Sequence, residues 1–249
     1  MLFDLHCHTI ASGHAFSTLK ELCIEAKKKG LKLIAQTDHG PNMPGGPHIY
    51  HINNQRIIPR ILEGVMVLRG VEANIIDFKG RLDIDEGSLK ELDLVIASLH
   101  PPCLRPGNKI ENTKALLRAM DNPYVDIIGH PGNPQFEIDI DAVVKKAKEK
   151  NILLEINNSS FGKSRPGSKE LCKKIINKAN ENKTKMVVGT DSHIYTQIGD
   201  FSLAKEVIKN TNLTDDLIVN YDLNWLIEFL ESKNKKYIGE IKEAYSKIK

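Results

Sequence analysis

The chain has 249 residues, of which 41% are hydrophobic and 27% are charged, which favours one large α/β domain with a full core over a disordered protein. The formal net charge of +3 is small and the lysines are scattered, so no long nucleic acid is an expected partner. No apolar run approaches the ~20 residues that span a bilayer and no leader segment is recognisable, so we expect a cytoplasmic protein without a membrane partner.

A strand over Leu2–His8 is the first predicted element. Side chains two residues apart lie on the same face of a strand. His6 and His8 should therefore share one face with Asp4, while the residues between them point to the other face. Two imidazoles on one face can hold a metal ion, so this strand is predicted to form one wall of a metal site.

Helices and strands then alternate along the chain. The strands after the first are predicted over Leu31–Thr37, Met66–Val71, Asp93–His100, Val125–His130, Ile152–Ile156 and Met186–Gly189. The helices are predicted over about Ser17–Lys29 with Ser17 as N-cap, about Ile52–Leu62 where Pro59 kinks or shortens it, Asn112–Met120, Ala142–Lys150, Lys169–Glu181, Leu203–Lys209 and Leu223–Lys247. Pro41–Pro47 is predicted to be a loop, and Arg81–Leu92 a partly irregular stretch.

Seven strands that alternate with helices predict a parallel sheet, which right-handed crossovers curl toward a barrel. An open, doubly wound sheet is the alternative. The barrel is favoured because histidines or acidic residues follow nearly every predicted strand. Only a closed ring brings the C-terminal ends of all its strands to one mouth, where the active sites of barrels are built.

Nine residues should converge at this mouth, and they include seven of the nine histidines of the chain. A lone histidine is more often a core or surface residue than a ligand, but seven at strand ends are harder to explain that way. Imidazoles and carboxylates without cysteine fit Zn²⁺, Mn²⁺ or Fe²⁺. Nine ligands exceed the needs of one ion and, with bridging carboxylates, suit three. The set is His6, His8, His14, His39, Glu72, His100, His130, Asp191 and His193.

Together these motifs resemble the signature of the PHP superfamily, named for polymerase and histidinol phosphatase. The resemblance rests on Asp4-Leu5-His6-Cys7-His8-Thr9, Thr37-Asp38-His39-Gly40, Gly70-Val71-Glu72, the strand-end His100 and His130, and Thr190-Asp191-Ser192-His193. Further stretches are similar to the small YcdX-type phosphatase branch, namely His130-Pro131-Gly132-Asn133-Pro134, Glu155-Ile156-Asn157-Asn158-Ser159-Ser160 and Ser164-Arg165-Pro166-Gly167-Ser168.

The resemblance implies a distorted (β/α)7 barrel that forms a single domain over residues 1–249, with C-terminal helices from about residue 223 packed on it. It also implies three divalent ions at the mouth, zinc in the first place and manganese or iron as alternatives. Carried over motif by motif, one ion would be held by His6, His8, Glu72 and Asp191. A second ion would be held by Glu72, His100 and His130. The third would be held by His14, His39 and His193.

The implied function is a metal-dependent phosphatase that hydrolyses a small phosphomonoester with a metal-bridging hydroxide. Asp191 could steer the nucleophile or only bind metal, and Arg165 either clamps the phosphate or faces solvent. A nuclease-type PHP hydrolase that cleaves phosphodiesters and a non-catalytic metal-binding barrel are the alternatives. The sequence identifies neither the substrate nor the oligomeric state.

A few polar residues near these motifs have two interpretations. Glu155 and Asn157 either orient the ligand imidazoles or pack inside the barrel. Asp38 beside His39 and Asp4 near His6 could orient ligands rather than bind metal. His48 and His51 lie outside the family motifs, and we interpret both as surface residues.

Overall fold

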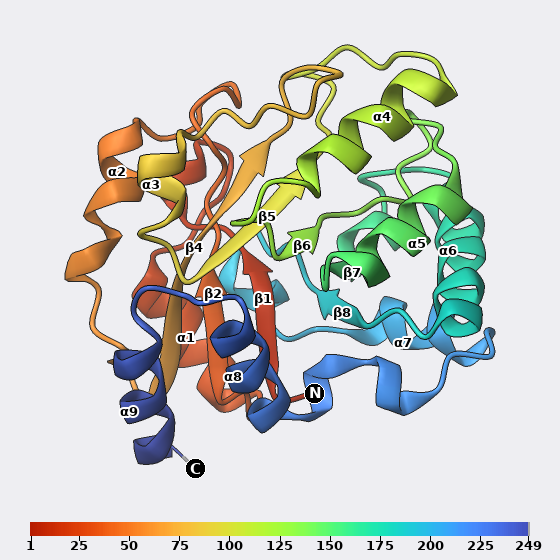
Figure 1. The fold of residues 1–249 in the computed structure, drawn as a ribbon. Coiled ribbons are helices and arrows are strands. Elements are labelled where there is room, and N and C mark those ends of the chain that lie inside the picture. Colours follow the sequence, from red (N-terminus) through yellow and green to blue (C-terminus); the bar gives the residue numbers. More distant parts are fainter. Residues whose placement is uncertain (249) are drawn as a thin grey trace.

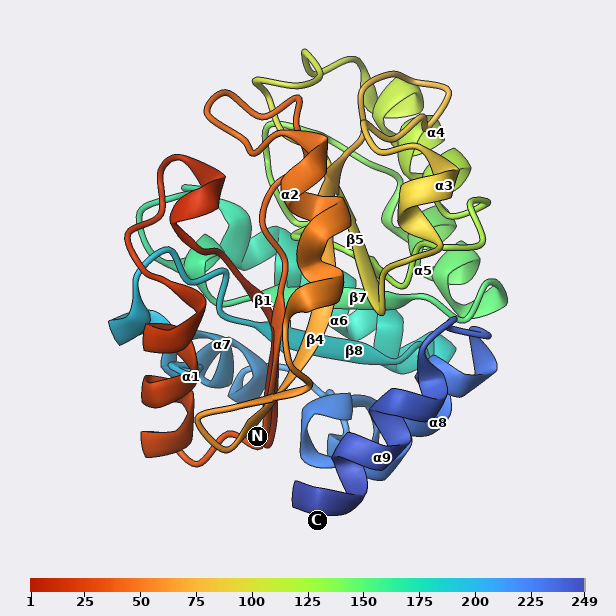
Figure 2. The same ribbon diagram turned by 90° about the vertical axis from the view of Figure 1, so that its left-hand side faces the viewer.

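The computed structural model describes residues 1–248 and is built around a sheet of parallel strands. Seven strands lie side by side in the order β1-β2-β4-β5-β6-β7-β8, and the short β3 pairs antiparallel with β4. Figures 1 and 2 show helices wrapped around this sheet. The strands are β1 (Phe3–Cys7), β2 (Leu33–Gln36), β3 (Ile61–Leu62), β4 (Val65–Asn74), β5 (Leu94–Ser98), β6 (Ile127–Ile128), β7 (Leu153–Asn157) and β8 (Met186–Gly189).

The described α-helices are mostly connections between successive parallel strands. They are α1 (Leu19–Lys28), α2 (Ile49–Asn53), α3 (Glu86–Leu89), α4 (Lys109–Ala119), α5 (Ile140–Glu149), α6 (Ser168–Asn182), α7 (Ser202–Lys209), α8 (Leu223–Ser232) and α9 (Ile238–Ile248). Short 3₁₀ helices lie over Ile10–Ser12, Asn54–Ile57, Ser159–Phe161, Tyr195–Gln197, Asp215–Leu217 and Val219–Tyr221.

The sheet closes on itself just beyond the ends of its first and last strands. The backbone N–H of Asp191 donates to the carbonyl oxygen of His6 at 2.8 Å, and that of His8 donates to Ser192 at 2.9 Å. Cys7 and Ser192 form a parallel bridge. The predicted barrel is therefore confirmed, and an open sheet is excluded.

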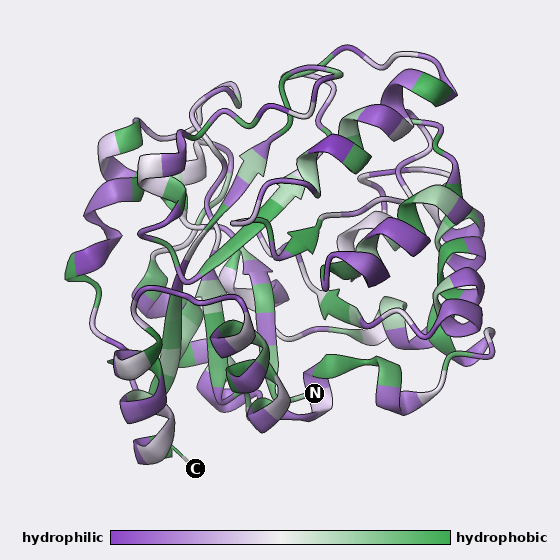
Figure 3. Cartoon of the chain, in the orientation of Figure 1, coloured by the Kyte–Doolittle hydropathy of each residue, from purple (hydrophilic) through white to green (hydrophobic). Residues whose placement is uncertain are grey.

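Buried apolar side chains form two clusters, one inside the ring and one outside it. The outer cluster lies between the strands and the helices, whose apolar stripes are visible in Figure 3. The inner cluster takes side chains from all seven parallel strands, for example Leu5 and Val187, and also from α8 and α9, for example Leu226 and Ile241. The two C-terminal helices therefore supply part of the apolar filling of the barrel.

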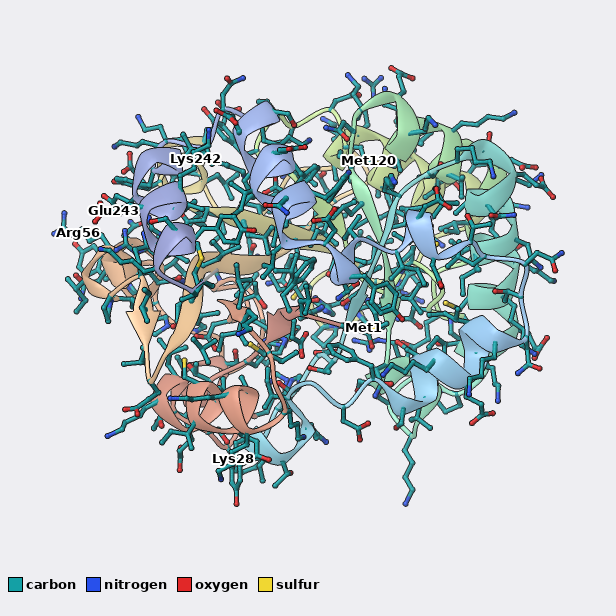
Figure 4. The ribbon with its side chains drawn as sticks, turned by 90° about the horizontal axis from the view of Figure 1, so that it is seen from below. Met1, Lys28, Arg56, Met120, Lys242 and Glu243 are labelled. Carbon is teal, nitrogen blue, oxygen red and sulfur yellow. The ribbon has the colours of Figure 1, made fainter. Side chains whose placement is uncertain are left out.

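Helices α8 and α9 lie near the start of β1, at the end opposite the C-terminal ends of the strands (Figures 1 and 2). Figure 4 views the protein from this side and labels Met1 together with Lys242 and Glu243 of α9. The ammonium group of Lys235, just after α8, lies 2.5 Å from the buried carboxylate of Asp126. Because these helices share a core and a buried ion pair with the barrel, we propose that they belong to the same domain.

Three details of the predicted elements were wrong. The N-cap of α1 is Thr18, one residue later than predicted, because its hydroxyl and the carboxylate of Glu21 form a reciprocal capping box. The helix predicted over Ile52–Leu62 is replaced by α2, a 3₁₀ turn and β3, since the residue before Pro59 is extended. The last predicted helix is two helices, α8 and α9, with Asn234 in the left-handed region between them.

The strict alternation predicted for the first strand was also wrong. The pairing of β1 with β2 shifts register between Asp4 and Cys7, so that Leu5 faces the inside of the ring but Cys7 faces the outer cluster. Such a bulge re-aims the side chains that follow it. Asp4 consequently accepts hydrogen bonds from Thr190, and its Oδ1 also accepts the backbone N–H of His6 at 3.4 Å.

In the described residues no helix combines the length and the apolar character that crossing a membrane requires.

Candidate metal centre

The carboxylate of Glu72, near the end of β4, lies in the middle of the predicted cluster and is completely buried. Its two oxygens face different imidazoles. Oε1 lies 2.9 Å from Nε2 of His130 and 3.2 Å from Nε2 of His100. Oε2 lies 2.7 Å from Nδ1 of His39 and 3.3 Å from Nε2 of His6. A carboxylate that presents one oxygen to each of two histidine sets has the arrangement of a bridging ligand.

A second carboxylate, that of Asp191, lies beside His6 of β1 and beside His8, which follows the strand. Its Oδ1 is 3.1 Å from Nε2 of His8 and 3.6 Å from Nε2 of His6. Asp191 and His130 both have positive φ angles, 54° and 30°. Non-glycine residues are held in that region at a cost, and such strain concentrates at functional sites.

The remaining predicted ligands lie at the outer edge of the cluster. Nε2 of His14 and Nε2 of His193 are 3.0 Å apart. The ring of His14 is also 5.0 Å from that of His39, centroid to centroid. Because Nδ1 of His193 lies 3.0 Å from the carbonyl oxygen of Asp191, its proton belongs on that nitrogen and its Nε2 is an acceptor. The structure thus brings all nine predicted residues together.

Partners on the far side of the imidazoles fix which nitrogen faces the centre. Nδ1 of His6 donates to the carboxylate of Glu155 at 2.6 Å, and Nδ1 of His100 donates to the side-chain oxygen of Asn74 at 2.7 Å. Glu155 also accepts the backbone N–H of His130 at 2.8 Å. Both imidazoles therefore present Nε2, the nitrogen that a metal ion would bind, to the centre.

Burial and neighbouring charges set the protonation of the cluster. Burial lowers the pKa of His8 to about 3 and that of His130 to about 4, so both are neutral at pH 7. Burial opposes the charge of Glu72, but the imidazoles around it, His100 first, hold its pKa well below the ordinary value. Burial likewise opposes the charge of His6, yet the carboxylates of Glu155 and Glu72 raise its pKa well above the ordinary value.

Several buried polar atoms at the centre have no hydrogen-bond partner among residues 1–248. They are Nε2 of His6, Nδ1 of His39, Nε2 of His100 and Oε2 of Glu72. Each orphaned group costs about 1–3 kcal/mol unless something else satisfies it. A set of nitrogen and carboxylate donors aimed at common points is what Zn²⁺, Mn²⁺ or Fe²⁺ binds, so these residues fit metal ions.

In each of three groups of residues, the possible ligand atoms all lie within 4.8 Å of one another, which is compatible with one ion shared by the members of that group. The groups are His8 with His39 and His193, His6 with His8 and Asp191, and His39 with Glu72 and His100. Each of the three groups shares at least two members with one of the three predicted ligand sets, and the second group lies wholly within one of them. His39 belongs to two groups, because its ring lies between Glu72 and the outer histidines.

The predicted phosphate-binding residue, Arg165, reaches the edge of the cluster. Its Nη1 donates to Oδ2 of Asp191 at 3.1 Å and to the hydroxyl of Ser160 at 3.1 Å. The side chain is 15% exposed, so the alternative of a solvent-facing arginine is wrong. Asn157 donates to both Glu155 and Asp191, which makes it a link between the two carboxylates.

Sequence reasoning missed some of the residues that surround the ligands. Asn74 lies two positions after Glu72 in the same strand, and this spacing was a signal for a shared face. Ser12 lies in a 3₁₀ turn and no sequence signal marks it. The surface interpretation holds for His48, which is exposed, whereas His51 is only partly exposed and also contacts Asp38.

Comparison with known proteins adds independent information. A family model described as the PHP domain matches residues 4–159. A protein of Clostridium botulinum (strain Langeland) named probable phosphatase is 53% identical over 234 residues, which are 94% of this chain and 96% of that protein. A protein of Thermoanaerobacter sp. (strain X514), also named probable phosphatase, is 52% identical over 96% of this chain and 98% of its own length.

Among solved structures, the histidinol phosphate phosphatase of Lactococcus lactis in complex with zinc, L-histidinol and phosphate has a similar fold. Its TM-score is 0.56 at 18% identity, over 85% of this chain and 94% of that one. A putative histidinol phosphatase from Listeria monocytogenes has a TM-score of 0.55 at 14% identity, over 80% of this chain and 98% of that one.

Proposed function

The chain belongs to the PHP domain family, and from this premise we propose that it is a metal-dependent phosphatase that hydrolyses a small phosphomonoester at a centre of three divalent ions. The observation that carries the proposal is the convergence of nine imidazole and carboxylate side chains on a mouth where four buried ligand-type atoms lack a hydrogen-bond partner among the described residues. The names of the curated relatives support the phosphatase class.

The ligand division that we propose follows the two oxygens of Glu72. His6 and His8 with Asp191 would hold one ion on the Oε2 side, and His100 with His130 would hold a second on the Oε1 side. The outer histidines, His14, His39 and His193, would hold the third. Zinc is the first choice, since the structurally similar histidinol phosphatase was crystallised with it, and manganese or iron suits the same donors.

Bound divalent ions would supply a nucleophile from water near neutral pH and would neutralise charge on the phosphoryl oxygens. The chain itself must then position the substrate and match its charge. Arg165 suits the phosphate, because its planar guanidinium offers paired donors beside Asp191 at the edge of the cluster. Asp191 would orient a water at Oδ1, next to His8.

The small net charge supports a small substrate over a long nucleic acid. The same centre has the chemistry to cleave a phosphodiester. The two ester classes differ in the negative charge that they bring to Arg165 and in the room that a second ester group needs. A direct comparison of monoester and diester turnover therefore separates the proposal from its nuclease-type alternative.

The test loads the purified protein with zinc, manganese or ferrous iron and measures hydrolysis of a broad phosphomonoester panel that includes p-nitrophenyl phosphate. Bis(p-nitrophenyl) phosphate is the diester probe. We expect monoester turnover that a chelator abolishes, that added metal restores, and that His8→Ala removes, while His48→Ala behaves like the parent. Metal binding without turnover of any ester would favour a non-catalytic barrel, and faster diester turnover would favour the nuclease class.

A further inference from the structure

Helix α2 lies outside the ring of strands, yet one of its histidines reaches the end of β2. Nε2 of His51 lies 3.1 Å from Oδ2 of Asp38, whose side chain is completely buried. Because a carboxylate oxygen can only accept, the proton lies on Nε2 of His51, which donates it. Gln36 donates to the same oxygen at 2.8 Å.

The other oxygen of Asp38 faces the turn after β1. Oδ1 accepts the backbone N–H of Thr9 at 2.7 Å and the hydroxyl of Ser12, also at 2.7 Å. Burial opposes the charge of this carboxylate, but the hydrogen bonds from His51, Ser12 and the backbone of Thr9 hold its pKa below the ordinary value. Asp38 is thus an ionised group held in one orientation by donors from three segments of the chain.

The orientation of Asp38 determines what Ser12 can do. Since the hydroxyl proton of Ser12 points to Asp38, its lone pairs are left to accept from other groups. One accepts Nδ1–H of His8 at 3.2 Å, and the other accepts the backbone N–H of His39 at 3.2 Å. His8 therefore presents its unprotonated Nε2 to the centre, and the backbone that carries His39 is fixed by the same hydroxyl.

We propose that His51 is a positioning residue for the metal centre. By donating to Asp38 it fixes the carboxylate that orients Ser12 behind two of the proposed ligands, His8 and His39. The inference rests on the proposed function for the existence of the metal site, but it concerns a residue outside the ligand set. The side chain of His51 is 36% exposed, whereas Asp38, Ser12 and His8 are each completely buried. The chain of hydrogen bonds thus runs from the protein surface to the centre.

The test compares His51→Phe, which keeps a ring of similar size but cannot donate, with His51→Gln, whose amide places a donor close to Nε2 of the imidazole. His48→Phe is the matched control, because His48 is exposed one turn earlier and caps α2 through the N–H of Tyr50 without touching Asp38. For each variant, zinc affinity is measured by competition with a chromophoric chelator, and kcat and KM are measured with p-nitrophenyl phosphate.

We expect His51→Phe to weaken zinc binding and lower kcat by about 10-fold each, the low end of the effect of orienting partners, because its contact to the ligands is indirect. KM should change by less than about twofold, since no substrate contact is lost. His51→Gln should recover most of the zinc affinity, and His48→Phe should match the parent. If His51→Phe does not fold, His51→Asn replaces it, because the shorter amide does not reach Asp38.

Two results would overturn the positioning role of His51 and leave the proposed function unaffected. One is parental zinc affinity in His51→Phe, and the other is a His51→Gln variant as impaired as His51→Phe, which would mean that the ring serves only for packing. A parent protein that binds no zinc, manganese or iron would instead overturn the proposed function, and this inference with it.

Discussion

Replacing Glu72 by glutamine keeps the shape of the side chain but removes its negative charge from the middle of the histidine cluster. The carboxylate faces His100 and His130 through one oxygen and His6 and His39 through the other, all within 3.3 Å. A glutamine offers one oxygen and one N–H₂ group, so one of the two histidine sets meets a donor instead of an acceptor. The substitution should therefore disturb two ion sites at once.

The size of the effect follows from burial. Removing one partner of a fully buried, charge-paired group costs about 3–5 kcal/mol. Since about 1.4 kcal/mol corresponds to a factor of ten, metal affinity should fall about 200- to 5,000-fold. The metal-free fold should persist, because the amide can still hydrogen bond to the imidazole nitrogens that the carboxylate contacts.

The assay is the metal content of the protein after dialysis at a fixed free zinc concentration, together with phosphomonoester turnover. Glu170→Gln is the matched control, because Glu170 is exposed on α6 and pairs with Lys173 in the neighbouring turn. We expect Glu72→Gln to retain at most one ion per chain and to lose turnover, while its far-UV circular dichroism stays that of the parent. A Glu72→Gln protein with full metal content and parental activity would refute the bridging role.

Three further outcomes are expected. Glu155→Gln removes the negative charge behind His6 and should lower zinc affinity about 10- to 100-fold in the same competition assay, with little change in urea unfolding. The raised pKa of His6 means that the metal-free protein holds a proton on this imidazole, which zinc binding must displace. Zinc affinity should therefore rise with pH until the pH passes the pKa of His6. Calorimetry in buffers of different ionisation enthalpy should detect the release of this proton. Lys235→Met leaves Asp126 buried without its partner and should lower the free energy of unfolding by about 3–5 kcal/mol, measured in urea, at unchanged metal content.

The strands and most of the cluster were predictable because they rest on local patterns. The apolar runs before His100 and His130 form β5 and β6, and closing these strands into a ring brings their ends to one mouth. The nine residues were predicted from their position after strands, and the structure gathers all of them. Their roles as metal ligands stay a prediction.

What escaped the sequence depends on contacts between distant segments. The bulge in β1 that turns Asp4 toward Thr190 is a property of its pairing with β2, which periodicity does not reveal. Ser12 and His51 look like unremarkable polar residues until the fold places Asp38 between them. Arg165 could be predicted as a site residue from its sequence motif, but its contact with Asp191 at the edge of the cluster is seen only in the structure.

The placement of α8 and α9 has a practical consequence for handling the protein. Figure 1 shows both chain ends beside these helices, on the side where β1 begins, whereas the candidate metal centre forms where the strands end. A purification tag or a surface linker attached at either terminus should therefore leave the mouth of the barrel open to solution. An enzyme tethered through one end and the same enzyme tethered through the other should turn over a small substrate at equal rates.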